Sequence, residues 1–432
     1  MALSDNPTVL ANTVYARKYV YVVNEITKTW RNTSFMLDNV KRMAPKFNQQ
    51  GRQGIIPLET SGNNSFRFFT PGEGPAEAGS ASYTEATIDF ASMSVTAEYD
   101  YHVKLANATN EQSFIRVRMK AVADAVEAMG YHWSHSLMIP KTGAIARLKT
   151  NTAGTTWQLY KENESAANGT FGSRYLFRNG MVSASANTAG LDAESAFDGN
   201  SLGVDYVNDK VTFSGMNTAS LQAGDYIYWG SKYKTSKGRC FTGLPTIVDD
   251  GTNYAVFEGR DRTVAGNEDW QAGLDTGFGT GNIELEMIRQ AINQKKRLPG
   301  SKTDVVLYGM RTQMLHFQQQ SAAKQSMLPV SAIKGGPTFT GGWSALPVFY
   351  GNDQMLAMAT EEYPDNVMYG LNWDGLGLAM MPGGEPTWIN EGEGDFKYVP
   401  DTTNWRAMLV AVGQFVSKQP ALNWQTNGIV SF

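Results

Sequence analysis

Few side chains in this sequence of 432 residues are of the types that do chemistry. It has four histidines, and His132 and His135 are spaced i,i+3, so that they would share one face of a helix as two zinc ligands do. No cysteine or cluster of carboxylates nearby offers a third ligand. Surface or interface histidines are the better interpretation, while His102 and His316 stand alone.

Patterns that mark nucleophiles or phosphate sites are incomplete. The single cysteine, Cys240, lies in KGRCFTG, which has no feature that activates a thiol. The segment GGWSALP lacks the closing glycine of a hydrolase elbow, and the GFGTG run at 277–281 follows no predicted strand and contains no lysine. The acidic residues Glu391, Glu393 and Asp395 alternate with other residues in a glycine-containing loop. We therefore predict no catalytic residue, no cofactor and no metal site.

Composition favours a folded chain rich in strands and loops. Hydrophobic residues make up 42% and charged residues 18%, with 43 glycines and one cysteine, which excludes an intrachain disulfide. No apolar run reaches the roughly 18 residues that span a bilayer, and the N-terminus has no signal-peptide layout, so we expect a soluble protein made in a cytoplasm. The net charge is −4, but residues 1–50 carry +4 and residues 51–100 carry −5, which reflects either pairing or ordinary surface variation.

A long hairpin is the most unusual predicted element. The first 48 residues mix polar, apolar and basic types without a period, as an arm does. Residues 66–69 predict a short aromatic strand, and the Pro/Gly-rich stretch after it has no apolar residue larger than alanine. Residues 91–105 then alternate strictly, which predicts roughly 50 Å of strand. The hairpin over 55–105 should therefore project beyond a compact domain.

A long helix and a mixed α+β region follow. Thr109 and Gln112 have capping-box spacing, and apolar residues recur at helical spacing to about residue 138. Residues 150–235 look β-rich, with strands at 175–179, 210–215 and 225–230. Beyond Cys240 we predict helices at 282–297 and 310–324 and strands at 304–308, 346–350, 367–371, 376–381 and 405–416.

This order of parts resembles the Hong Kong 97-type fold of tailed-bacteriophage major capsid proteins, which herpesvirus shells and encapsulins share. The stretch at 92–129 looks like the family's junction of extended loop and spine helix, and it reads SMSVTAEYDYHVKLANATNEQSFIRVRMKAVADAVEAM. The resemblance implies an α+β, Hong Kong 97-like fold with peripheral and axial domains. Its parts would be an N-arm (1–48), an extended-loop hairpin (49–105), a spine helix of the peripheral domain (106–149), a β-rich insertion (150–235), an axial domain with remaining peripheral elements (236–392) and a C-terminal strand returning to the peripheral domain (393–432).

The resemblance also implies a function. The chain would be a structural subunit and not an enzyme, assembling with itself as pentamers and hexamers into an icosahedral virion shell in the host cytoplasm. Expected partners are a portal, a separate scaffolding protein and a decoration or cement protein, with double-stranded DNA enclosed without sequence-specific binding and no membrane. Candidate contacts between subunits are Arg17, Lys18, Arg52, Phe66, Arg67, Phe68, Phe69, Glu73, Glu77, Arg116 and Arg118.

One departure from the family matters. Some members join subunits covalently through a lysine of the extended loop, whereas this chain has no lysine between Lys46 and Lys104. A non-covalent shell is therefore expected. Three alternatives stay open: an encapsulin-like nanocompartment shell, a carbohydrate-binding virion module that uses aromatic residues, and a hydrolytic enzyme. The aromatic candidates for the second are Trp157, Tyr160 and Tyr175.

Overall fold

The protein has a strand-rich α+β fold with one long helix in its described part, α5 (Glu111–Ser136). None of the described helices is long and apolar enough to cross a membrane. The computed structural model describes residues 41–43, 53–62, 65, 68, 70–71, 74, 79–100, 111–160, 171–177, 180–185, 197–214, 221–230, 238–275, 303–308, 346–350, 353–359, 367–373, 375–381, 386–389, 396–398 and 404–427.

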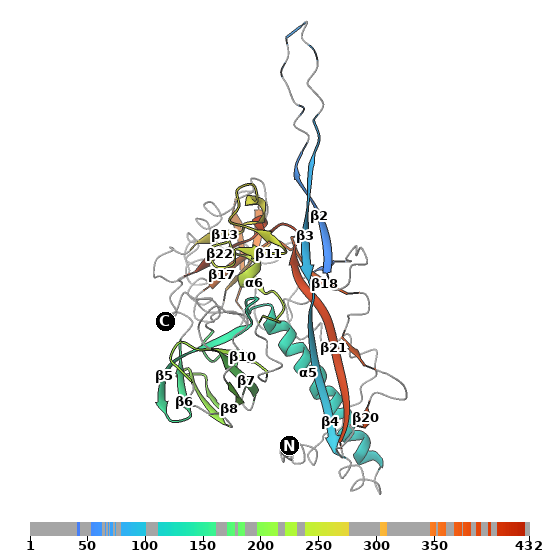
Figure 1. Ribbon diagram of the computed structural model, residues 1–432, viewed down its shortest axis with the longest axis vertical. Helices are drawn as coiled ribbons and strands as arrows, with labels where there is room; N and C mark the ends of the chain where they lie inside the picture. The colour runs from blue at the N-terminus through green and yellow to red at the C-terminus, as the bar shows by residue number, and fades with distance from the viewer. Residues whose placement is uncertain are drawn as a thin grey trace.

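A two-stranded ribbon covered by α5 forms the long axis of the molecule (Figure 1). Strand β4 (Ala91–Asp100) pairs antiparallel with β21 (Asn404–Ser417) over its whole length, which confirms the predicted strands at both places. The alternation in β4 places its odd residues on one face. On that face Ala97 packs with Ala125 of α5, and the helix continues into the main core at Trp133. The predicted long helix is confirmed as α5.

Strand β21 is shared by several partners. Its second edge carries short strands that pair with it antiparallel, and the parallel strand β1 extends this sheet beyond β18. These strands are β18 (Leu376–Met380), β19 (Thr387–Trp388), β20 (Lys397–Tyr398) and β1 (Lys41–Met43).

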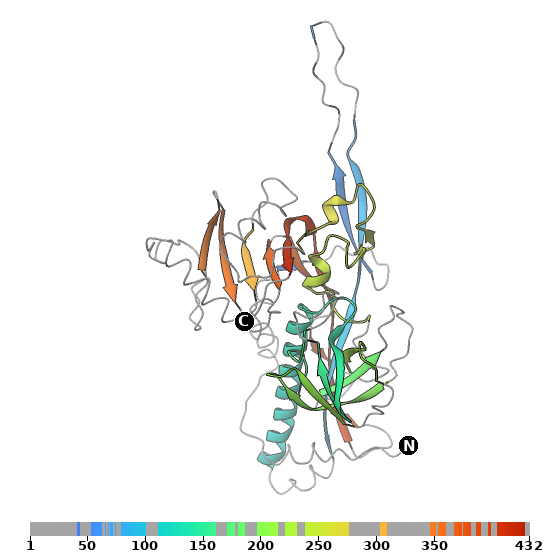
Figure 2. The same cartoon turned by 90° about the vertical axis from the view of Figure 1, so that its left-hand side faces the viewer.

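The hairpin consists of β2 (Gln53–Ser61) and β3 (Ser82–Asp89), and it points away from the body in both views (Figures 1 and 2). The prediction that residues 91–105 belong to the hairpin is wrong for 91–100. After Phe90 the chain continues as β4, which pairs with β21 and not with β2. Burial decides this register, since the apolar face of β4 is covered by α5.

A closed barrel lies beside α5 (Figure 2). Two of the predicted strands in this region are confirmed as β9 and β10. The prediction of a strand at 175–179 is wrong for its described residues, 175–177, because residues 172–175 form a turn that begins at Gly172 with φ +56°. In order around the barrel the strands are β10 (Tyr226–Trp229), β5 (Ala144–Ala153), β6 (Thr156–Leu159), β9 (Lys210–Ser214), β8 (Phe197–Asp205) and β7 (Gly180–Ser185).

A further six-stranded mixed sheet includes three of the predicted strands, those at 304–308, 346–350 and 367–371. The helices predicted at 282–297 and 310–324 lie outside the described residues, as do His102, His316, the GFGTG run and the acidic loop at 391–395. In order the strands are β13 (Gly273–Asp275), β22 (Trp424–Asn427), β17 (Val367–Leu371), β14 (Val305–Tyr308), β16 (Asp353–Ala359) and β15 (Leu346–Tyr350).

Candidate functional site

The base of the β2–β3 hairpin is anchored in the body. Ile88 is buried against Ala379 of β18 and Val416 of β21, and Ala86 belongs to the main core. The backbone N–H of Thr87 donates a hydrogen bond of 2.8 Å to the carbonyl oxygen of Glu258. Three consecutive residues of β3 therefore fix the direction in which the hairpin leaves the body.

The outer half of the hairpin is held mainly by its own two strands. The Ser61 hydroxyl donates to the Ser82 hydroxyl at 2.9 Å, and the Thr60 hydroxyl donates to the Ser82 carbonyl at 3.2 Å. Tyr83 is 72% exposed, and Phe68 beyond it is 88% exposed. A lone two-stranded hairpin is marginally stable in water. A long one with aromatic side chains in solvent is suited to lie on another surface.

The structure separates some of the predicted contact residues. Phe68 is on the projection, whereas Arg116 and Arg118 are in the first two turns of α5, whose side chains are not described. Figure 1 shows that end of α5 at the opposite end of β4 from the hairpin. The remaining candidates lie outside the described residues: Arg17, Lys18, Arg52, Phe66, Arg67, Phe69, Glu73 and Glu77.

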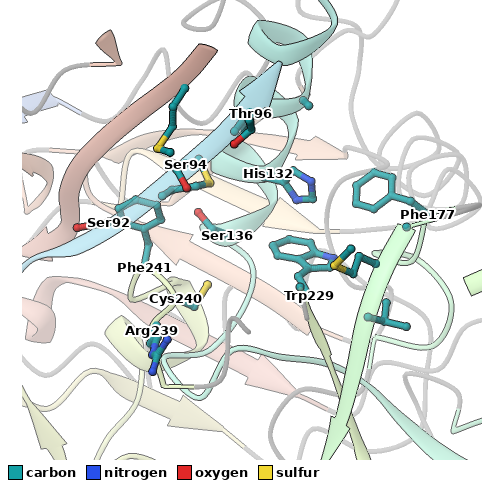
Figure 3. Close-up of a pocket in the computed structure, with 18 of the residues that line it drawn as sticks. Ser92, Ser94, Thr96, His132, Ser136, Phe177, Trp229, Arg239, Cys240 and Phe241 are labelled. Atoms are coloured by element: carbon teal, nitrogen blue, oxygen red, sulfur yellow. The ribbon is translucent and has the colours of Figure 1, made fainter. Parts of the chain in front are cut away.

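A cleft of about 680 Å³ lies between β4, α5 and the rim of the barrel (Figure 3). Its lining mixes hydroxyls of β4, such as Thr96, with the aromatic rings of Phe177 and Trp229 and with Arg239. Cys240 also lines it, and burial raises the pKa of this thiol to about 12. This shift keeps the thiol in its neutral form.

His135 is buried, so the expectation of a surface or interface histidine is wrong for it, whereas His132 is partly buried and lines the cleft. The ring of His135 stacks on Tyr131 with centroids 3.7 Å apart, and its Nδ1 is 2.8 Å from the Tyr131 carbonyl. His132 meets Phe177 and Trp229 edge-on at 5.0 and 4.9 Å. Burial lowers the pKa of both imidazoles to about 4, and the neighbouring His135 lowers that of His132 further. Neutral rings thus join α5 to the barrel.

No group of three or more metal-binding side chains occurs in the described part of the chain. The aromatic residues considered for carbohydrate binding are also engaged. Trp157 and Tyr175 are buried in the core, and the ring of Tyr160 lies 5.2 Å from the Arg147 guanidinium. Neither buried ring is available to stack on a sugar.

A buried charged cluster beneath the hairpin was missed by the sequence reasoning. Glu258 and Arg262 are both buried, in and just after the tight turn between β11 (Val256–Phe257) and β12 (Arg260–Asp261). The Arg262 guanidinium donates to the carbonyls of Thr246 and Ile247 at 2.8 and 2.9 Å. The only signal in the sequence is the Glu-Gly pair at 258–259, which marks a turn but not its burial.

No protein-family model matches the sequence, and no curated protein matches it significantly. Solved structures of shells resemble it in outline. The Cyanophage A-1(L) capsid asymmetric unit contains a chain that is 11% identical with a TM-score of 0.43, covering 97% of this chain and 98% of that one.

Two further structures cover nearly the whole chain. A chain of the satellite phage P4 procapsid including the size determination (Sid) protein is 10% identical with a TM-score of 0.41, covering 99% of this chain and 98% of that one. A chain of the holo-SrpI encapsulin complex from Synechococcus elongatus is 9% identical with a TM-score of 0.40, covering 99% and 96%. At these scores, the function proposed below rests on the chain's own geometry.

Proposed function

We propose that this chain is the major capsid protein of a tailed bacteriophage, a structural subunit with a Hong Kong 97-like fold that assembles with itself into a closed shell. The observation that carries the proposal is the hairpin. Its base is fixed by Ala86, Thr87 and Ile88, while the described residues of its outer half include the exposed Phe68 and Tyr83 and no buried side chain. Such an element gains its stability when a neighbouring copy covers it.

The ribbon and helix support the same proposal. The long pairing of β4 with β21, backed by α5, gives a stiff body from which the hairpin extends (Figure 1). In the proposed assignment, residues 49–90 are the extended loop, 91–100 the body strand β4, 106–149 the spine helix and 393–432 the returning terminal strand. The remaining parts are an N-arm at 1–48, a surface insertion at 150–235 and an axial region at 236–392.

The proposed shell is an icosahedral virion capsid built from pentamers and hexamers without covalent links. The absence of lysine between Lys46 and Lys104 supports non-covalent contacts. The shell encloses double-stranded DNA without reading its sequence, in keeping with the net charge of −4. A portal, a separate scaffolding protein and a decoration protein are the proposed further partners, and the proposed subunit has no enzymatic role.

Negative-stain electron microscopy of the purified protein, with sedimentation velocity, tests this proposal. Closed shells, or rings of five and six copies, are the expected result. The contents of the shells distinguish a virion protein, which packages DNA, from an encapsulin-like protein, which packages other proteins. A monomer that stays monomeric at high concentration and with scaffolding protein present would refute the proposal.

A further inference from the structure

The turn between β11 and β12 has an unusual residue at its first central position. Glu258 has φ +50° and Gly259 has φ +74°, so both central residues of this two-residue hairpin loop are left-handed. Such loops favour Asn, Asp or Gly, because other side chains crowd the backbone at positive φ. The left-handed backbone is costly for a residue with a Cβ such as Glu. A glutamate held in this way is a candidate for a specific role.

Glu258 touches two elements that meet at the hairpin base. Its carbonyl oxygen accepts the N–H of Thr87 in β3 at 2.8 Å, and its Oε1 accepts the N–H of Ser417, the last residue of β21, at 3.1 Å. Gly259 fits directly against Thr87, where a Cβ would collide with the threonine hydroxyl. The turn therefore closes over the point where β3 and the end of β21 lie next to each other.

The carboxyl of Glu258 is buried without full compensation. The residue is 9% exposed, and its Oε2 is buried with no hydrogen-bond partner. An ionised carboxylate in this position is expensive because one oxygen has neither water nor a donor. Burial is the main reason that the pKa of Glu258 is raised to about 8, against the opposing effects of the Ser417 N–H, Arg262 and Lys141.

Two cations act on the Glu258 carboxyl, and the two strands that it contacts present uncharged residues to it. Arg262, beyond β12, and Lys141, after α5, are the cations that act on Glu258, while Thr87 of β3 and Ser417 of β21 are uncharged. The two terminal nitrogens of Arg262 donate to backbone carbonyls, and its charge is supported by the nearby carboxyls of Asp249, Glu258 and Asp250. Arg262 therefore acts on Glu258 through its charge, and the buried Oε2 of Glu258 still has no hydrogen-bond donor.

We propose that the turn at Glu258 and Gly259 is a proton-dependent clamp on the base of the hairpin. When the Glu258 carboxyl is neutral, the turn is hydrogen-bonded to β3 at Thr87 and to the end of β21 at Ser417. Loss of the proton places an uncompensated charge beside both strands, so the turn moves outward to reach water and frees the Thr87 N–H. This device belongs to the single chain and does not depend on whether the chain forms shells.

The direction and size of the effect follow from proton linkage. The closed state holds its proton up to about pH 8, whereas an open, solvated Glu258 loses it near the ordinary value of 4.5. The closed state therefore binds more protons in this window, and its stability falls as pH rises. The equilibrium constant for opening the clamp is expected to increase by up to about tenfold per pH unit until about pH 8 and to level off above it. The full tenfold applies when Glu258 is completely solvated in the open state.

Hydrogen exchange detected by mass spectrometry on the full chain tests the clamp, with labelling times scaled for the intrinsic pH dependence of exchange. In the wild type, protection of the peptide that contains Thr87 should fall between pH 6 and pH 8. Glu258→Gln keeps an oxygen for the Ser417 N–H but cannot ionise, so in this variant the protection of the Thr87 peptide should stay constant between pH 6 and pH 8. Glu85→Gln, which changes an exposed carboxyl of the same strand, should behave like the wild type.

A further variant guards against a global effect. Gly259→Ala meets Thr87 and should lower protection of that peptide at every pH, while protection of β17 in the distant sheet stays unchanged. The clamp is refuted if the wild-type peptide shows no excess pH dependence. It is equally refuted if Glu258→Gln shows the same dependence as the wild type, or if β17 loses protection in parallel with β3.

Discussion

Shortening the hairpin separates folding from assembly. Ser61 pairs directly with Ser82, so residues 62–81 can be replaced by Asn-Gly, the preferred two-residue hairpin loop. The anchored residues of β3, from Ala86 to Ile88, are untouched by this change. Phe68 is 88% exposed, so its removal sacrifices little packing.

The magnitude follows from loop closure. Replacing a loop of about 20 residues by a two-residue loop lowers the entropic free-energy cost of loop closure by (3/2)RT ln 10, or about 2 kcal/mol. The shortened monomer should therefore be as stable as the full chain or up to about 2 kcal/mol more stable in urea unfolding. If the hairpin is an assembly element, shells should be absent in sedimentation velocity and electron microscopy.

A matched pair of point variants checks that the effect belongs to the hairpin. Phe68 and Val207 are exposed to nearly the same extent, 88% and 86%, but Val207 lies on a turn of the barrel. Phe68→Ser should weaken assembly, and Val207→Ser should leave it intact. Shells of normal size and yield from the shortened chain would show that the reasoning about the hairpin is wrong, and so would an unfolded monomer.

Three other outcomes are expected. Trp133→Ala removes a fully buried ring at the junction of α5 and the ribbon, and it should lower the free energy of unfolding by about 3–5 kcal/mol in urea titrations. Arg406→Ala breaks the exposed 3.0 Å ion pair with Glu98 and should cost less than about 1 kcal/mol, a difference that high salt reduces. Because burial lowers the pKa of His132 and His135 to about 4, the folded state binds fewer protons than the unfolded state between pH 6.5 and 4, so stability should fall as pH falls through that window. The double variant with Gln at both positions should lose less stability between pH 7 and pH 5 in the same titration.

Periodicity in the sequence was sufficient to predict strand β4 of the ribbon and the helix α5 that covers it. The alternation from Ala91 predicted β4, and the helical spacing of apolar residues predicted α5. An element that is buried on one face has its apolar residues spaced at the period of the strand or helix. The pairing partner of β4 was beyond this reasoning. Asp100 and Asn404 are neighbours in the ribbon, but no local signal connects segments so far apart in the chain.

The candidate site was predictable only in outline. The Pro/Gly-rich stretch indicated a segment without a core of its own, but the projection was predicted from the alternation at 91–105, of which 91–100 belong to the ribbon. The anchoring of Thr87 by Glu258 depends on a contact between distant segments. The histidines illustrate the same limit. Their i,i+3 spacing placed His132 and His135 on one face of a helix, but it did not reveal that the barrel covers that face.

The position of β21 within the chain has a consequence for how the protein is made. Residues 404–417 pair with β4 and β18, so the hydrogen-bonding edge of β4 lacks this partner strand until the chain has been translated past residue 404. Contacts of such long sequence separation form slowly, since the loop between them must close first. On the ribosome, the barrel at 144–229 is complete much earlier and can fold as a unit. Completion of β21 therefore acts as a late checkpoint, and a chain cut short before it would lack a stable base for its hairpin.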